Sequence, residues 1–157
     1  MIDDGAFDLT QNNNSMNTVK LVAVFAENRP GQAARVTDIL ARANINIRCI
    51  TVASSGAFGV MKLLVNDPDL ACRSLQKEGF AATLMDVLAV EMPDKPGALH
   101  TVAECLAAHQ INLCNTTGFV ANQRAILVIE VENPAQAGEV LSKQGLRVLS
   151  QKEALAV

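Results

Sequence analysis

The chain has 157 residues, of which 50% are hydrophobic and 18% are charged, so it can bury a core and is not disordered as a whole. Its 13 basic and 16 acidic residues give a net charge of −3, and its aromatic residues are 5 Phe with no Trp or Tyr, which argues against nucleic acid as a partner. No apolar run approaches the roughly 20 residues that span a membrane, and the N-terminus lacks a basic-then-apolar pattern. We therefore expect a cytoplasmic protein without a signal peptide or membrane contact.

Residues 1–18 are predicted to form a flexible N-terminal tail. Asp, Gly, Gln, Asn and Ser crowd this stretch, most densely at residues 11–15. Such a composition buries too little apolar surface to order itself.

The next predicted elements are a strand, a helix and a second strand. Residues 21–26 form a short apolar run before a Pro-Gly turn, which is typical of a buried strand. The apolar residues that follow recur with the spacing of one helix face: Val36, Ile39, Leu40 and Ala43. Residues 46–54 are rich in β-branched side chains and predict the second strand.

A third strand, a second helix and a fourth strand complete this unit. Residues 60–65 predict the third strand. Asp67 and Pro68 predict a helix start, because Asp accepts hydrogen bonds from free N–H groups and Pro lacks a donor that would stay unpaired there. Gly79 stands where a helix ends in a left-handed residue, and residues 80–84 predict the last strand.

The same signals recur 66 residues further along the chain. The matching segments are Pro30-Gly31 with Pro96-Gly97, Ile45-Asn46-Ile47 with Ile111-Asn112-Leu113, Asn66-Asp67-Pro68 with Glu132-Asn133-Pro134, and Gly79 with Gly145. We therefore predict two copies of one fold, at residues 19–85 and 86–157. Residues 80–92 read as one strand broken only near Asp86, so no linker separates the units, and residues 146–150 predict the final strand.

The order βαββαβ, read twice, predicts an α+β fold. Each unit forms an antiparallel sheet with both helices on one face. A unit of this size leaves its sheet edges poorly protected. We therefore predict that the units pack side by side into one eight-stranded antiparallel sheet with the helices on one face. We also expect a homo-oligomer, although pairing within the chain already protects these edges, so the edges alone do not imply it.

The cysteines are predicted to be small core residues in a reducing cytosol. They are Cys49, Cys72, Cys105 and Cys114. None forms a C-x-x-C pair, and neither His100 nor His109 sits beside one, so the sequence predicts neither a metal site nor a catalytic Cys–His pair.

The turn between the first strand and the first helix of each unit is the best candidate for chemistry. It reads Glu27-Asn28-Arg29-Pro30-Gly31-Gln32-Ala33 in the first unit and Pro93-Asp94-Lys95-Pro96-Gly97-Ala98-Leu99 in the second. Gly lets the backbone approach a ligand, and the helix N-terminus offers free N–H groups to an anion. Asn28 or Asp94 can accept a hydrogen bond from an ammonium group. A site for an anion beside a site for an ammonium group matches the two charges of a free amino acid. The alternative is that Pro-Gly only makes the turn and that Asn28 or Asp94 caps the helix.

Asn46 and Asn112 lie between apolar residues at the predicted helix-to-strand corners. An amide in such a run needs partners for both of its ends. The side chain either bonds the backbone and fixes the corner or reaches across the interface between the units to a ligand. The residues alone favour the corner role.

These motifs together resemble the ACT domain, a small-molecule-sensing module of amino-acid metabolism. The resemblance covers residues 19–152 as two ferredoxin-like units. Residues 27–31 with residues 45–47 are similar to the serine-sensing ACT domain of bacterial phosphoglycerate dehydrogenases, although the His of that pattern, two positions before its Asn, is Ala26 here. The whole chain is similar to stand-alone tandem ACT proteins of bacteria.

The resemblance implies that amino acids bind at the seam between two units, where the first loop of one unit faces the second strand of its partner. Carried over by position, one site uses Asn28, Gly31, Gln32 and Ala33 with Asn112. The other uses Asp94, Gly97, Ala98 and Leu99 with Asn46. Neighbouring positions complete the predicted ligand-binding set: Arg29, Pro30, Ile47, Lys95 and Leu113. The resemblance implies no catalytic residue, no metal and no cofactor.

Other βαββαβ modules need residues that this chain lacks. A copper carrier needs C-x-x-C in its first loop, and an RNA-recognition module needs aromatic residues on its central strands, which residues 60–65 and 126–131 do not supply. An acylphosphatase-like enzyme needs a loop Arg and a strand Asn. Arg29 and Asn46 fit that pair, but the second unit offers only Lys95, which lacks the bidentate guanidinium.

Two functional hypotheses follow. The first is a non-catalytic sensor that binds a free amino acid between its units. The second is a regulatory subunit or interaction module for an amino-acid biosynthetic enzyme, with or without a ligand. Well-formed pockets at the seam favour the first hypothesis, and an apolar surface patch beyond that needed for self-pairing favours the second.

Overall fold

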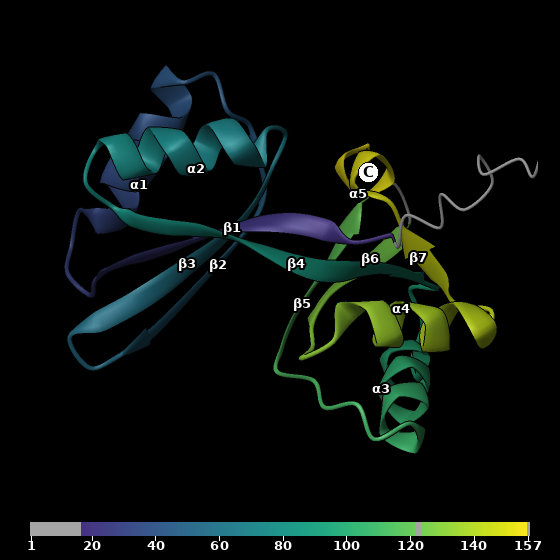
Figure 1. Cartoon of the computed structure of the whole chain (residues 1–157). Helices are drawn as coiled ribbons and strands as arrows, with labels where there is room; N and C mark the ends of the chain where they lie inside the picture. Colours follow the sequence, from purple (N-terminus) through teal and green to yellow (C-terminus); the bar gives the residue numbers. More distant parts are fainter. Residues whose placement is uncertain (1–16, 122–123, 157) are drawn as a thin grey trace, which may run out of the picture.

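Two βαββαβ units follow one another along the chain, as predicted (Figure 1). The computed structural model describes residues 17–121 and 124–156, so residues 1–16 of the predicted tail lie outside the described residues. The first unit comprises β1 (Val19–Glu27), α1 (Gln32–Arg42), β2 (Ile47–Ser55), β3 (Phe58–Val65), α2 (Pro68–Lys77) and the first part of β4 (Ala81–Met92). The second comprises the rest of β4, α3 (Ala98–Ala108), β5 (Asn115–Ala121), β6 (Arg124–Glu130), α4 (Pro134–Lys143) and β7 (Arg147–Leu149), and it is followed by α5 (Gln151–Leu155).

The strands form one antiparallel sheet in the order β2-β3-β1-β4-β6-β5, with β7 also paired with β4. The α+β fold is thus confirmed, but the described residues form a sheet of 7 strands where we predicted eight. The last strand of the first unit and the first strand of the second are a single strand of 12 residues. The predicted break at Asp86 does not occur, because Asp86 lies opposite Lys20 on β1 and forms an ion pair with it at 3.2 Å. The predicted boundary between the units therefore falls inside β4.

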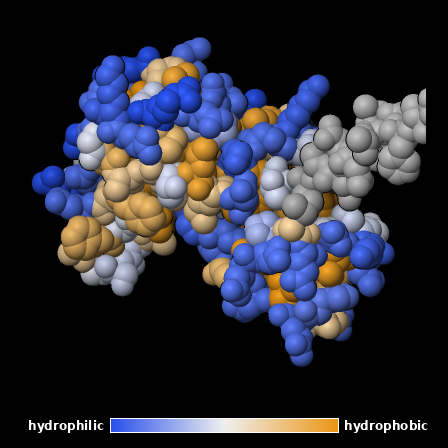
Figure 2. Space-filling model, viewed as in Figure 1, coloured by the Kyte–Doolittle hydropathy of each residue, from blue (hydrophilic) through white to orange (hydrophobic). Residues whose placement is uncertain are grey.

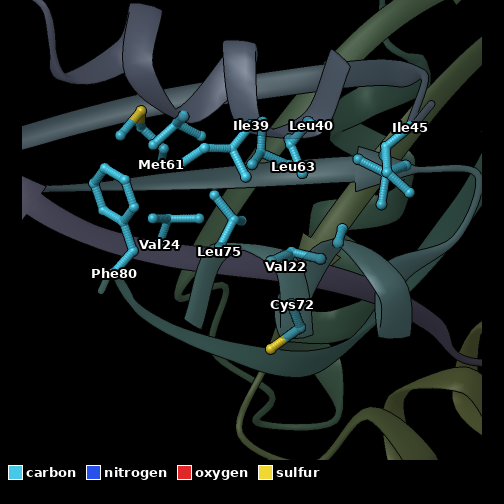
Figure 3. Close-up of a cluster of buried hydrophobic side chains, with 13 residues drawn as sticks. Val22, Val24, Ile39, Leu40, Ile45, Met61, Leu63, Cys72, Leu75 and Phe80 are labelled. Atoms are coloured by element: carbon cyan, nitrogen blue, oxygen red, sulfur yellow. The ribbon is translucent and has the colours of Figure 1, made fainter. Parts of the chain in front are cut away.

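Helices cover one face of the sheet in each unit. On α1 the predicted apolar face is buried, and it packs with β1, β3 and α2 in the first core (Figure 3). The second core lies between β4, β6, α3 and α4. The predicted helix starts are also confirmed, since the Asp67 carboxylate accepts from the N–H of Leu70 at 2.9 Å and the Asn133 amide oxygen accepts from that of Gln136 at 3.1 Å.

A third core forms where the helix-free faces of the two units meet. Leu21 and Leu64 of the first unit pack here with Ile126 and Val128 of the second. Ala154 of α5 closes the same cluster. Burial of these side chains binds the two units together beyond their shared strand.

The C-terminal end differs from the prediction. The last strand is limited to Arg147–Leu149, and the chain then forms α5 instead of continuing as strand to residue 150. Ser150 and Glu153 form a capping box, in which each side chain satisfies a backbone N–H of the other.

The cysteines are only partly core residues. Cys72 is buried, while Cys49 and Cys105 are partly buried against the cores. Burial raises the pKa of the Cys49 and Cys105 thiols, as expected for unreactive packing residues. Cys114 is exposed, so the core prediction is wrong at this position, which lies between α3 and β5.

The structure adds two observations that concern membranes and metals. Within residues 17–121 and 124–156, no helix has the length and apolar character needed to cross a membrane. In the same part of the chain, no three His, Cys, Asp or Glu side chains gather closely enough to hold a metal ion.

Candidate functional site

The loops that precede α1 and α3 have the same backbone conformation. Gly31 and Gly97 are the N-cap residues, with φ values of +92° and +88° that favour glycine. No described side chain caps either helix, so the alternative role of Asn28 and Asp94 as helix caps is wrong. The first N–H of each helix donates back into the loop, from Gln32 to Arg29 at 3.4 Å and from Ala98 to Lys95 at 3.2 Å. The next two N–H groups of each helix therefore remain available to an anion.

Asn28 ties the first loop to the turn between β2 and β3. Its Nδ2 donates to the carbonyl oxygen of Gly56 at 3.0 Å, and its backbone N–H donates to that of Ala57 at 2.8 Å. Because the amide nitrogen is engaged, the Oδ1 atom is the part of this side chain that remains for a ligand. An amide oxygen accepts well from an ammonium group.

A hollow of about 420 Å³, here called the first hollow, opens beside this loop. The loop residues that line it are Asn28, Arg29, Pro30, Gly31, Gln32 and Ala33, all of them predicted site residues. Val52 and Ser54 of β2 and Met61 of β3 form the facing wall. The first hollow holds one cation and one anion, Arg29 and Glu27, which pair with each other at 2.6 Å.

The second hollow, of about 830 Å³, opens beside the second loop. Of the predicted residues, Lys95, Gly97 and Ala98 line it, whereas Asp94 and Leu99 are exposed and do not. Its volume, like that of the first hollow, falls in the range of about 300–1,000 Å³ typical of small-molecule sites.

Sequence reasoning missed three charged side chains in the second hollow, those of Glu91, Arg124 and Arg147. Arg124 and Arg147 both donate to the carboxylate of Glu91. The hydrogen bond from Arg124 is the main cause that holds the pKa of Glu91 below its usual range. These three residues lie far apart in sequence and meet only because β6 and β7 pair with β4. Their proximity could have been predicted only from the register of those strands.

The two predicted corner asparagines do not reach either hollow. The backbone N–H of Asn46 donates to the side-chain oxygen of Asn66 at 2.8 Å, and the backbone N–H of Asn66 donates to the carbonyl oxygen of Asn46 at 3.2 Å. The Asn46 side chain is exposed. Asn112 is exposed too and lines a separate hollow with Cys114. Ile47 and Leu113 pack against the first and second cores. A single copy of the chain therefore does not bring Asn112 to Asn28, or Asn46 to Asp94.

Comparisons with known proteins agree with this architecture. The sequence matches the family model of the ACT domain pair over residues 17–157. The structure is similar to that of protein BT0572 from Bacteroides thetaiotaomicron, with 31% sequence identity, a TM-score of 0.83 and coverage of 87% of this chain and 95% of that one.

Two regulatory subunits of aspartate kinase share the fold at lower identity. The one from Thermus thermophilus has 18% identity and a TM-score of 0.60, over 82% of this chain and 93% of that one. The one from Thermus flavus has 17% identity and a TM-score of 0.54, over 82% and 92%. No curated protein sequence matches the chain. The duplicated βαββαβ fold, the two glycine-initiated loops and the match along nearly the whole described sequence lead to one assignment: the chain belongs to the ACT domain pair family.

Proposed function

We propose that this chain is a non-catalytic cytoplasmic sensor that binds a free amino acid at the loop before the first helix of each unit and thereby regulates an enzyme of amino-acid metabolism. One observation carries the proposal: in both units a glycine-initiated helix begins at the wall of a hollow of ligand size. The Thermus thermophilus protein with the same fold is a regulatory subunit of aspartate kinase, which supports a regulatory role.

The first hollow suits the two charges of an amino acid. Its carboxylate fits at the N-terminus of α1, where free N–H groups and the helix dipole favour an anion. Its ammonium group fits at the Oδ1 atom of Asn28, whose nitrogen is held by Gly56. The side chain then extends toward Val52 and Met61.

A second copy of the chain would complete these open sites. β2 and β5 are the terminal strands of the sheet, so each offers an edge that no described strand pairs. Ile50 and Val52, on the helix-covered side of β2, are 43% and 62% exposed. Pairing with another copy at these edges would bury them beside the first hollow and provide the seam that one chain lacks.

A specific observation favours the second candidate function, docking onto a partner enzyme. Phe25 and Phe58 are 52% and 67% exposed on the helix-free side of the first unit. Figure 2 shows apolar surface over the β2–β3 hairpin, at the left of the molecule. Edge pairing does not need these two rings, so they suit a protein contact that acts with or without a ligand.

A thermal-shift screen of the full chain against the twenty amino acids tests the sensor function. A ligand at 100 times its Kd adds about 2.7 kcal/mol of stability and raises Tm clearly. Asn28→Ala should remove binding at the first loop, while Asp38→Ala on the exposed side of α1 should leave it intact. If no amino acid raises Tm, the sensor function is rejected and the docking function remains.

A further inference from the structure

The same place in the fold carries opposite chemistry in the two units. The second unit has Glu91, Arg124 and Arg147 where the first unit has, 66 residues earlier, Phe25, Phe58 and Ala81. The strand register confirms the equivalence, because Glu91 lies opposite Arg147 and Phe25 lies opposite Ala81. An apolar surface in one unit is thus an ionic cluster in the other.

One carboxylate oxygen organises the ionic cluster. The Oε2 atom of Glu91 accepts from Arg124 Nη2 and from Arg147 Nη1, the latter at 2.7 Å. Arg147 also donates from Nη2 to Glu153 at 2.8 Å. These bonds fix both guanidinium groups, so little conformational entropy remains to be lost when a ligand binds them.

Hydrogen-bonding capacity remains within the cluster. The Nε atom of Arg124 is buried and has no partner among the described residues. The Oε1 atom of Glu91 likewise accepts from no described donor. A buried donor without a partner is costly.

The two hollows also differ in charge. Glu27 and Arg29 of the first hollow neutralise each other. The second hollow is lined by three cations, Lys95, Arg124 and Arg147, and by one anion, Glu91. Glu153 offsets Arg147 from outside the hollow, which leaves Lys95 without an ion pair among the described residues.

We propose that the second hollow is specific for an acidic amino acid, whereas the first takes a neutral one. The inference rests on the proposed amino-acid-binding function and names the ligand class of each loop. An acidic amino acid brings one ammonium group and two carboxylates. The ammonium is accepted by Glu91 Oε1, one carboxylate binds the N-terminus of α3, and the other binds Arg124 and Lys95. A neutral amino acid would leave Lys95 unmatched.

Isothermal titration calorimetry of the full chain tests this assignment. The ligands are aspartate and glutamate, their amides asparagine and glutamine, succinate as a dicarboxylate without an ammonium group, and inorganic phosphate. We expect an acidic amino acid to bind one site at least about tenfold more tightly than its amide, since a hydrogen bond between charged groups contributes about a tenfold to hundredfold difference. Neither succinate nor phosphate should match it.

Two variants locate the site. Arg124→Gln and Lys95→Gln should each weaken binding of the acidic ligand about tenfold or more, and neither should change binding at the first loop. Lys143→Gln removes the same charge from an exposed position on α4 and serves as the matched control. Because Lys95 is exposed, its variant should fold even if Arg124→Gln does not.

The possible results distinguish failure of the acidic-ligand assignment from failure of the proposed amino-acid-binding function. Equal affinity for the acid and its amide, or folded variants that bind as the wild type does, would overturn the inference and leave amino-acid sensing intact. Phosphate or succinate binding as tightly as aspartate would show a general anion site and overturn it as well. If no amino acid binds at either loop, the proposed function itself fails.

Discussion

Thr51 on β2 and Thr117 on β5 share a hydrogen bond of 2.7 Å between their Oγ1 atoms, and they are equivalent residues of the two repeats. The two units therefore meet through the same position, and β2 and β5 lie beside each other. The surroundings are not symmetric. Lys62 pairs with Glu130 across the same interface, but their counterparts in the other unit are Val128 and Leu64.

The first prediction concerns the Lys62–Glu130 ion pair, whose side chains are only 17% and 12% exposed. Lys62→Met or Glu130→Gln leaves one partner unpaired in the interface and should lower the free energy of unfolding by about 3 kcal/mol. The double variant Lys62→Met/Glu130→Met should lose less than the sum of the single changes. Urea unfolding measures all of these values.

The exposed pair of Lys20 and Asp86 provides a matched control. Lys20→Met should cost no more than about 1 kcal/mol, because solvent screens an exposed ion pair. If Lys62→Met costs as little as Lys20→Met, the interfacial pair is not a significant link between the units.

The second prediction is that both units unfold in one transition. They share β4 and the helix-free core, so neither can lose its structure without exposing the other. Leu64→Ala in the first unit and Ile126→Ala in the second should each lower the free energy of unfolding by about 2–5 kcal/mol. Calorimetry should show this as a single peak at a lower temperature. Two separate peaks in either variant would contradict this coupling.

Local signals predicted the elements well, because turn and cap chemistry is written in short segments. Asp67, Asn133 and the glycines Gly79 and Gly145 stand where the sequence indicated. The predicted strand break at Asp86 was wrong. Asp is rare inside strands, but the long-range ion pair with Lys20 compensates its charge here. The capping box after β7 was readable from Ser150 and Glu153, yet the strand-like run that precedes it concealed it.

The candidate site was predictable to the same degree. The glycine loops follow from sequence, and the first hollow contains the predicted residues of its loop. The walls of the second hollow were not predictable in this way, because Glu91 and Arg124 meet through pairing of β4 with β6. The resemblance implied a binding seam between the two units of one chain, but Asn46 and Asn112 line neither hollow.

The third prediction concerns the glycines that begin α1 and α3. Gly31→Ala and Gly97→Ala should each destabilise the chain by about 1 kcal/mol, because an L side chain is strained at these positive φ values. No heavy atom lies within 4 Å of the added Cβ at either position, so strain and not a clash causes the loss.

Gly118 on β5 is the control for these changes. It has no positive φ, and its nearest contact would be Leu127 at 3.6 Å, so Gly118→Ala should have little effect on Tm. Each loop variant should also weaken ligand binding at its own hollow only, since the strained backbone turns the helix N–H groups away. Unchanged Tm and binding in Gly31→Ala would show that the left-handed turn is not required.

The fourth prediction is a pH dependence that arises from Glu153. Hydrogen bonds from Ser150 are the main cause that lowers its pKa from 4.5 to about 2, with a further contribution from Arg147. Because the folded-state pKa lies below the unfolded value, the carboxylate stabilises the fold above pH 4.5, and this contribution is lost as the pH falls toward 2. Glu153→Gln should therefore have a lower Tm than the wild type at pH 6, and the gap should narrow at pH 3.

Glu139→Gln, an exposed change on α4, should show no such convergence. A gap that stays constant between the two pH values would mean that Glu153 contributes through packing, and that α5 is held over the helix-free core without its charged cap.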